Sequence, residues 1–174
     1  MDSFSIRPEL PRLLPALRAY GRTLARSAAA ADDLVQETIL RALRAETQFE
    51  PGTELRAWLF TILRNVWLGQ ARKAGRERRA LEAQRPEESR PASQGDRLEL
   101  DELARAMAEL PLAQREALML VGVQGMTTAQ VAEVVGVAEG TIKARVSRAR
   151  SALRAALVHR AGPDLDRTNT HSSS

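Results

Sequence analysis

The aromatic residues are confined to the first part of the chain, and this distribution constrains the fold more than any other feature. All six lie within the first 67 of 174 residues: Phe4, Tyr20, Phe49, Trp58, Phe60 and Trp67. The rest of the chain must therefore build its core from Leu, Val, Ile, Met and Ala. Because strands favour aromatic and β-branched residues, this composition favours closely packed helices. The sequence predicts an all-α fold.

A stretch rich in acids, Pro and Ser divides the chain into two parts. It follows a basic segment and contains Pro86, Pro91 and Gly95, a composition that is typical of a linker. We therefore expect two small helical domains joined by a flexible linker, with the domains over 8–81 and 97–160 and the linker over 82–96. The polar, Ser/Thr-rich tail 161–174 is expected to be disordered.

The composition excludes several classes of site. No Cys is present, which rules out a disulfide framework, a Cys-ligated zinc site and a thiol nucleophile. Only two His residues occur, and His171 lies in the polar tail, so a His-based metal site or catalytic triad is not expected. No cofactor is expected either, and an enzyme is the least favoured class because no Gly-rich phosphate loop accompanies the acids Asp32, Asp33 and Glu37. The sequence shows no signal peptide and no apolar stretch long enough to span a membrane. The expected location is the cytoplasm, with no membrane partner.

Hydrophobic periodicity predicts three helices in the first domain, over 10–27, 32–46 and 53–73. Thr53 is the expected N-cap of the third helix, which is apolar almost all round and should lie centrally in a bundle. The second helix has an apolar face formed by Val35, Ile39, Ala42 and Leu43. Its opposite face is charged but includes one apolar residue, Leu40.

Four helices are expected in the second domain, over 100–110, 111–122, 127–135 and 139–159. Thr127 and Gln130 predict a capping box at the start of the third, and Gly136 allows the positive φ of a tight turn at its end. A short capped helix, a glycine turn and a long helix in this order indicate a helix-turn-helix.

The last helix has the two faces expected of a DNA-reading helix. One face is apolar and should be buried: Ile142, Val146, Ala149, Leu153 and Leu157. The other carries small residues and Arg148, with cations on both flanks, which suits base edges and phosphates in a major groove. A basic face alone is more often a solvated surface. The preceding helix-turn-helix signal and the near-absence of acids favour DNA.

Four segments together resemble the extracytoplasmic-function (ECF, group 4) RNA polymerase sigma factors of the sigma-70 family. They are DDLVQETILRAL (32–43), LRAWLFTILRN (55–65), LPLAQREALMLV (110–121) and GTIKARVSRAR (140–150). Their order and spacing match region 2 followed by region 4 over about 8–158. FEPGTELRAWLFTILRN and REALMLVGVQG also resemble the general-stress-response (EcfG-like) group of that family.

The resemblance implies a transcription initiation factor with no catalysis of its own. Region 2 would dock on the β′ clamp helices of core RNA polymerase and region 4 near the β flap. The helix 32–43 matches the polymerase-binding helix, with its binding residues at Asp33, Gln36, Glu37, Leu40 and Arg41. The alternative for this helix is a solvated face with pairs such as Glu37–Arg41.

The resemblance also implies two contacts with promoter DNA. In region 2, the loop 49–56 and the helix after it match the −10 reader, with expected contacts from Thr53, Glu54, Arg64, Asn65, Arg72 and Lys73. In region 4, the −35 reader would use Thr141, Lys143, Ala144, Arg145, Ser147, Arg148 and Arg150. Among these, Arg148 is expected to contact a guanine. Trp58 and Trp67 are expected to pack in the core rather than to stack on bases.

The family context implies one further partner and leaves two alternatives. In the stress-response group a small helical NepR-type anti-sigma factor would hold the chain inactive; the free chain is expected to be a monomer. One alternative is a sigma-mimic that sequesters an anti-sigma factor without binding DNA. That mimic is fused to a phosphoreceiver domain, for which this chain has no additional residues, and it would not need a basic recognition helix. The other is an ordinary helix-turn-helix regulator, against which the region 2 segments argue.

Overall fold

A computed structural model describes residues 5–82 and 100–161 of the chain. Every regular element in these two ranges is helical, so the predicted all-α fold is confirmed. The expected linker and tail lie outside the described residues, except for Glu82 and Ala161, which end two helices. Within the described ranges, no helix combines the length and the apolar character needed to cross a bilayer.

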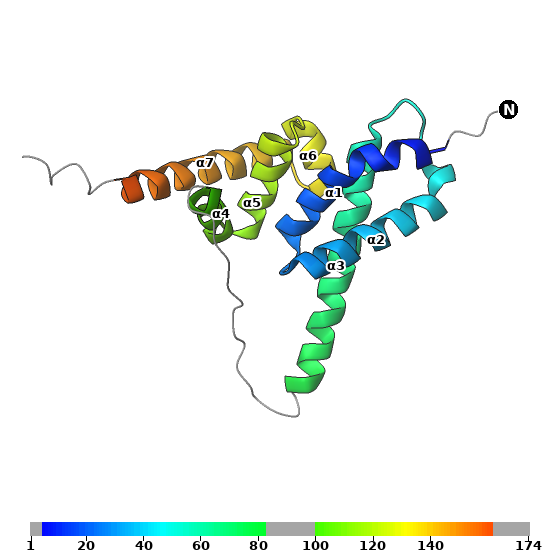
Figure 1. Cartoon of the computed structure of the whole chain (residues 1–174), viewed down its shortest axis with the longest axis horizontal. Helices are drawn as coiled ribbons and strands as arrows, with labels where there is room; N and C mark the ends of the chain where they lie inside the picture. Colours follow the sequence, from blue (N-terminus) through cyan, green and yellow to red (C-terminus); the bar gives the residue numbers. More distant parts are fainter. Residues whose placement is uncertain (1–4, 83–99, 162–174) are drawn as a thin grey trace, which may run out of the picture.

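The N-terminal unit is a bundle of three helices (Figure 1). Its elements are η1 (Arg7–Glu9), α1 (Leu10–Leu24), α2 (Ala28–Arg44), η2 (Glu46–Gln48) and α3 (Leu55–Glu82). The helices enclose large, fully buried side chains: Leu17, Tyr20, Leu34, Leu59, Phe60 and Leu63. The ring centroids of Tyr20 and Phe60 are 5.0 Å apart, so an aromatic pair joins α1 to α3. The second half of α3 extends beyond the bundle.

The C-terminal unit has a core without aromatic residues. Its elements are α4 (Leu100–Glu109), α5 (Leu112–Leu118), a π-helical turn η3 (Met119–Val123), α6 (Thr128–Val135) and α7 (Glu139–Ala161). The fully buried residues are aliphatic: Ala117, Leu120, Val131, Ile142 and Ala149. Small and aliphatic side chains allow these short helices to pack closely, as the sequence predicts.

The expected capping box and glycine turn of the helix-turn-helix are confirmed. The Thr127 side chain accepts a hydrogen bond from the backbone N–H of Gln130, whose side chain in turn bonds the Thr127 N–H. Gly136 has a φ of 76° and its N–H donates to the carbonyl oxygen of Ala132 at 2.8 Å. Local sequence therefore sets both ends of α6.

Two expected helix starts are wrong. α2 begins at Ala28 rather than at residue 32, because the Ser27 side chain caps it by accepting a hydrogen bond from the N–H of Ala30. Thr53 does not cap α3: its hydroxyl donates to the carbonyl oxygen of Glu50 at 2.7 Å, which closes the preceding turn, and the helix begins at Leu55.

The two units pack directly against each other. In Figure 1, α5 and α6 face α1 and α3, and contacts join α1 to α5 and α3 to α6. Buried side chains from both units form one continuous apolar cluster. No local pattern in the sequence predicts this arrangement, because the contacts join residues far apart in the chain.

The turn between α6 and α7 provides a test of backbone strain with an internal control. Gly136→Ala should lower the free energy of unfolding by about 1–2 kcal/mol, because a Cβ at positive φ crowds its own carbonyl oxygen. Space is not the limit, since no heavy atom lies within 4 Å of that Cβ. Gly140, in the first turn of α7, has no positive φ; Gly140→Ala should raise the free energy by about 0.5–1 kcal/mol. Urea denaturation measures both, and effects of the same sign would contradict the assignment.

Candidate DNA- and polymerase-binding surfaces

The long helix α7 separates a buried stripe from an outward basic face. Ile142, Val146 and Ala149 are buried against the rest of the C-terminal unit. Most of the predicted −35 residues are exposed, namely Thr141, Lys143, Ser147, Arg148 and Arg150, whereas Ala144 and Arg145 are half-buried. The structure therefore brings this predicted set together along one helix.

The predicted buried stripe is too long by about a turn. Leu153 is half-buried, but the side chain of Leu157 is 38% exposed. The reason is visible in Figure 1, where the last turns of α7 extend past the other helices of the unit. Periodicity gives the face of a helix but not the point where its packing partners end.

Glu139 bridges the two helices of the helix-turn-helix at the protein surface. Its carboxylate accepts a hydrogen bond from the Thr128 hydroxyl of α6 at 2.6 Å and pairs with Lys143 of α7 at 3.1 Å. The hydrogen bond from Thr128, and then Lys143, lower the pKa of the Glu139 carboxyl below its ordinary value. The residue also lies in the first turn of α7, where a negative charge is favoured by the helix dipole.

The titration of Glu139 tests this bridge. A lowered pKa in the folded state gives a stabilisation that is present above the ordinary value and is lost as the pH falls through the folded value. Thr128→Val removes the first cause, so the pKa of Glu139 should rise toward its ordinary value. NMR titration of the side-chain carboxyl carbon measures the shift. Thr47→Val, at an exposed site in the other unit, should leave it unchanged; equal titration curves in all three proteins would show that Thr128 does not act on Glu139.

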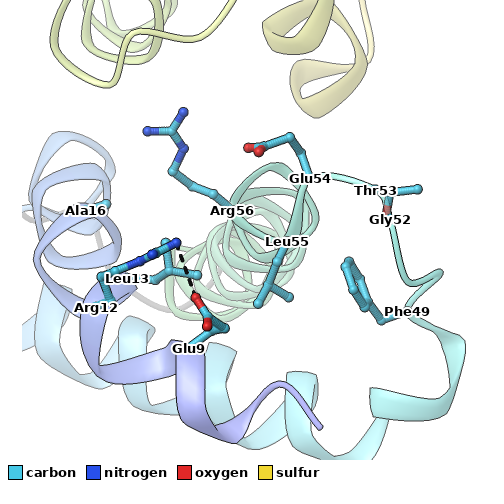
Figure 2. Close-up of a pocket in the computed structure, with 10 residues that line it drawn as sticks. All are labelled: Glu9, Arg12, Leu13, Ala16, Phe49, Gly52, Thr53, Glu54, Leu55 and Arg56. Atoms are coloured by element: carbon cyan, nitrogen blue, oxygen red, sulfur yellow. Dashed lines mark ion pairs between the residues drawn. The ribbon is translucent and has the colours of Figure 1, made fainter. Parts of the chain in front are cut away.

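The loop between η2 and α3 forms one wall of a pocket of about 410 Å³. Gly52, with a φ of 95°, and the turn from Glu50 to Thr53 shape the loop. The α1 side chains of Leu13 and Ala16 lie opposite, and the pocket is open at its rim (Figure 2). The predicted −10 residues Thr53 and Glu54 both line it.

The pocket combines an apolar lining with charged groups. Phe49 and Leu55 contribute apolar side chains, while Arg12 pairs with Glu9 at 3.2 Å on the α1 side. Glu54 and Arg56 extend from the start of α3 toward the neighbouring helices of the C-terminal unit (Figure 2). Phe49 is 6% exposed and its ring packs against Trp58 with the ring centroids 5.3 Å apart, so the lining offers an apolar wall with polar groups at its edge.

The remaining predicted −10 residues lie along α3 and divide into two groups. Asn65, Arg72 and Lys73 are exposed. Arg64 is not free in this arrangement: its Nε lies 2.9 Å from a carboxylate oxygen of Glu116, and its side chain is only 18% exposed. A phosphate contact by Arg64 therefore stays a prediction for a state in which this ion pair is broken.

Glu116 of α5 is a buried acid at the junction of the two units. The same carboxylate oxygen accepts a hydrogen bond from the Tyr20 hydroxyl at 2.6 Å. Burial, and then the nearby Glu116 charge, raise the pKa of the Tyr20 hydroxyl far above its ordinary value, so Tyr20 stays protonated and donates to Glu116. A third bond crosses the junction from Arg56 to the carbonyl oxygen of Gln124 at 2.8 Å.

The predicted polymerase-binding residues lie together on the outer face of α2. Asp33, Gln36, Leu40 and Arg41 are exposed and Glu37 is half-buried. Leu40 is 49% exposed although it is apolar. Glu37 pairs with Arg41 at 2.6 Å, which is the helix pair that a solvated face would also form. Trp58 and Trp67, by contrast, pack against the core, as expected.

Sequence reasoning missed two groups of residues. Glu116 occupies the apolar face of α5, four residues after Leu112 and four before Leu120; an acid at that register was the available signal. The α1 wall of the pocket carries no signal, because residues 9–16 meet the loop only through tertiary packing. In the described ranges, no cluster of three or more His, Cys, Asp and Glu residues is arranged to hold a metal ion.

Comparisons with known proteins match both units. Residues 11–77 match the model of Sigma-70 region 2, and residues 100–153 match the model of Sigma-70, region 4. The chain is 46% identical over 155 residues to the ECF RNA polymerase sigma factor EcfG of Rhodopseudomonas palustris, covering 88% of this chain and 85% of that one.

Solved structures agree with these matches. The sigma factor RpoE of Bartonella quintana, solved in complex with the anti-sigma factor NepR, is 41% identical with a TM-score of 0.74; the match covers 88% of this chain and 96% of that one. The PhyRSL–NepR complex from Sphingomonas sp. Fr1 is similar in fold alone, at 24% identity, a TM-score of 0.66 and coverage of 98% and 99%. Two sigma-70 regions in this order, with the near full-length similarity to EcfG, place this chain in the family of ECF RNA polymerase sigma factors, which are transcription initiation factors.

Proposed function

We propose that this sigma factor directs core RNA polymerase to promoters by reading the −35 element with α7 and the −10 element with the loop 49–56 and α3. The observation that carries the proposal is the outward face of α7, which exposes Lys143, Ser147 and Arg148. Arginine can bond a guanine edge with two hydrogen bonds, and Ala144 and Ser147 are short enough to let the helix approach the bases. Thr141, Arg145 and Arg150 would contact phosphates.

For the −10 element, we propose that one base leaves the stack and enters the pocket beneath the loop. A flipped base needs a stacking surface and hydrogen-bonding groups at its edge. Phe49 and Leu55 supply an apolar lining, and Thr53 and Glu54 supply polar atoms. Asn65, Arg72 and Lys73 would follow the adjacent strand along α3.

The −35 proposal is tested by base discrimination rather than by affinity alone. Arg148→Ala should reduce the preference for the matched −35 duplex over one with a changed guanine by about 1–3 kcal/mol, while core binding stays intact. Lys143→Ala should weaken −35-dependent initiation with core binding likewise intact. Arg154→Ala, an exposed cation of the same helix, should weaken binding to both duplexes alike. Fluorescence anisotropy with holoenzyme measures the ratio; unchanged promoter strength in Arg148→Ala and Lys143→Ala would refute the recognition surface.

For the polymerase, we propose that the outer face of α2 docks on the β′ clamp helices through Asp33, Gln36, Glu37, Leu40 and Arg41. Region 4 would add a second contact near the β flap. The exposed Leu40 supports this part of the proposal, because an apolar side chain among charged ones gives a partner surface an area to bury.

Two α2 variants distinguish a polymerase-docking face from a merely solvated one. Glu37→Lys and Leu40→Ala should each weaken co-purification with core polymerase by about tenfold, since each removes part of one contact surface. Leu40→Ala should leave thermal unfolding nearly unchanged, because the side chain is half exposed already. Glu133→Lys makes the same charge change as Glu37→Lys at an exposed site of α6 and should bind core normally. Normal binding by both α2 variants would remove this face as the docking site.

We further propose that the chain acts in a stress response under a small helical anti-sigma factor of the NepR type. Support comes from the sigma factor RpoE, which was solved with NepR. In this proposal the protein acts in the cytoplasm, has no catalytic activity and is a monomer when free. Its domains span 8–81 and 97–160, and a linker over 82–96 joins them. Mixing with a NepR-type protein from the same genome should block core binding. A chain that binds NepR but never core polymerase would instead be a sigma-mimic.

A further inference from the structure

Glu116 makes the junction between the two units depend on charge. The residue is 3% exposed, and burying a carboxylate is tolerated only when its oxygens are hydrogen-bonded and its charge is compensated. Both the compensating cation, Arg64, and the hydroxyl donor, Tyr20, come from the other unit. If the units separate, the carboxylate returns to water and the guanidinium of Arg64 is released.

The released group lies on the surface proposed to bind the −10 element. Arg64 precedes the exposed Asn65 and lies two turns before Arg72 on the same polar stripe of α3. Arg56, which lines the pocket beneath the loop, is also held by the C-terminal unit through the carbonyl oxygen of Gln124. The C-terminal unit therefore occupies two cations at the −10 surface.

We propose that Arg64 exchanges partners, leaving the Glu116 carboxylate for a promoter phosphate, so that the packed arrangement and −10 binding exclude each other. The proposal rests on the function proposed above, which assigns the α3 stripe to DNA. A guanidinium bonds carboxylate and phosphate oxygens with the same geometry. The two anions compete for one cation, and apparent DNA affinity falls with the fraction of chains that are packed.

Separation also exposes apolar surface, because the cluster of buried side chains is continuous across the junction. The ion pair is thus one of several contacts that hold the units together. Removing it should shift the balance toward the open form by about tenfold, the scale of a charge-assisted hydrogen bond, without separating every molecule.

The experiment measures DNA binding and interdomain distance in the full-length chain. Glu116→Gln keeps the size of the side chain but removes its charge. Glu102→Gln makes the same charge change at an exposed site of α4. The DNA probe is a short duplex of mixed sequence, because a phosphate contact does not depend on sequence. The chain has no Cys, so spin labels at Gln70→Cys and Ala155→Cys, both at exposed positions, report the distance by pulsed electron resonance.

Glu116→Gln should bind the duplex about tenfold more tightly than wild type, and its salt dependence should be steeper by about one phosphate contact. The double variant Glu116→Gln/Arg64→Ala should lose this gain in duplex affinity, and the control Glu102→Gln should not show it. Tyr20→Phe, which keeps the ring in the core, should shift affinity in the same direction by less. In the labelled chain, a larger fraction of Glu116→Gln molecules than of wild-type molecules should show a longer distance between the two labels. Adding DNA to the wild type should also increase that fraction.

Three results would count against the exchange, and a fourth would count against the proposed function instead. Wild-type affinity and distances in both Glu116→Gln and Tyr20→Phe, with normal circular dichroism, would show that the carboxylate does not hold the units together. If Glu116→Gln misfolds, wild-type DNA affinity and interdomain distance in the Tyr20→Phe protein would by themselves show that the carboxylate does not hold the units together. A longer distance without a gain in affinity would show that Arg64 does not pass to DNA. A wild-type protein that shows no preference for the matched −35 duplex, although its interdomain distance still changes in Glu116→Gln, would refute the proposed function. It would leave the role of Glu116 at the junction intact.

Discussion

One buried carboxylate fixes how the two units pack against each other, beside the apolar cluster that they share. Glu116 is compensated only by groups from the other unit, the Arg64 guanidinium and the Tyr20 hydroxyl. A charge-assisted hydrogen bond contributes about 1.5–3 kcal/mol, and an uncompensated buried charge costs more than that. The junction is therefore selective for one arrangement, because no apolar repacking would satisfy the carboxylate.

This junction links the two surfaces proposed to bind promoter DNA, which the fold otherwise keeps separate. The outward face of α7 is open to solvent, whereas α6 packs against α3 and the α3 residues Arg64 and Arg56 bind Glu116 and Gln124 of the C-terminal unit. In the proposed account, a chain with this arrangement can present its −35 surface while its −10 surface is incomplete. The face of α2 proposed to bind polymerase is also exposed, so docking on polymerase would not require separation of the units.

Features set by local sequence can be predicted, and features set by tertiary packing cannot. The capping box at Thr127, the left-handed Gly136 and the outward face of α7 follow from short-range spacing, and the structure contains all three. The predicted start of α2 is wrong because a run of alanines after Ser27 has no amphipathic pattern, although alanine favours helix. The exposure of Leu157 and the pocket wall from α1 depend on which elements meet, and periodicity carries no information about that.

Arg64 shows the limit most clearly. The family resemblance assigns its position to DNA, and the polar stripe of α3 agrees, but neither reveals that a carboxylate 52 residues away occupies it. The partner is visible in the sequence only as an acid at an apolar register of α5. Interpreting such a residue as half of an ion pair requires knowing which helix lies opposite.

The most direct test of the central claim is transcription in vitro with core polymerase from the source organism and sheared genomic DNA, with and without this protein, followed by sequencing of transcript 5′ ends. The account predicts new start sites that share one −35 and one −10 element at constant spacing. Core polymerase that binds the protein but gains no new start sites would contradict it.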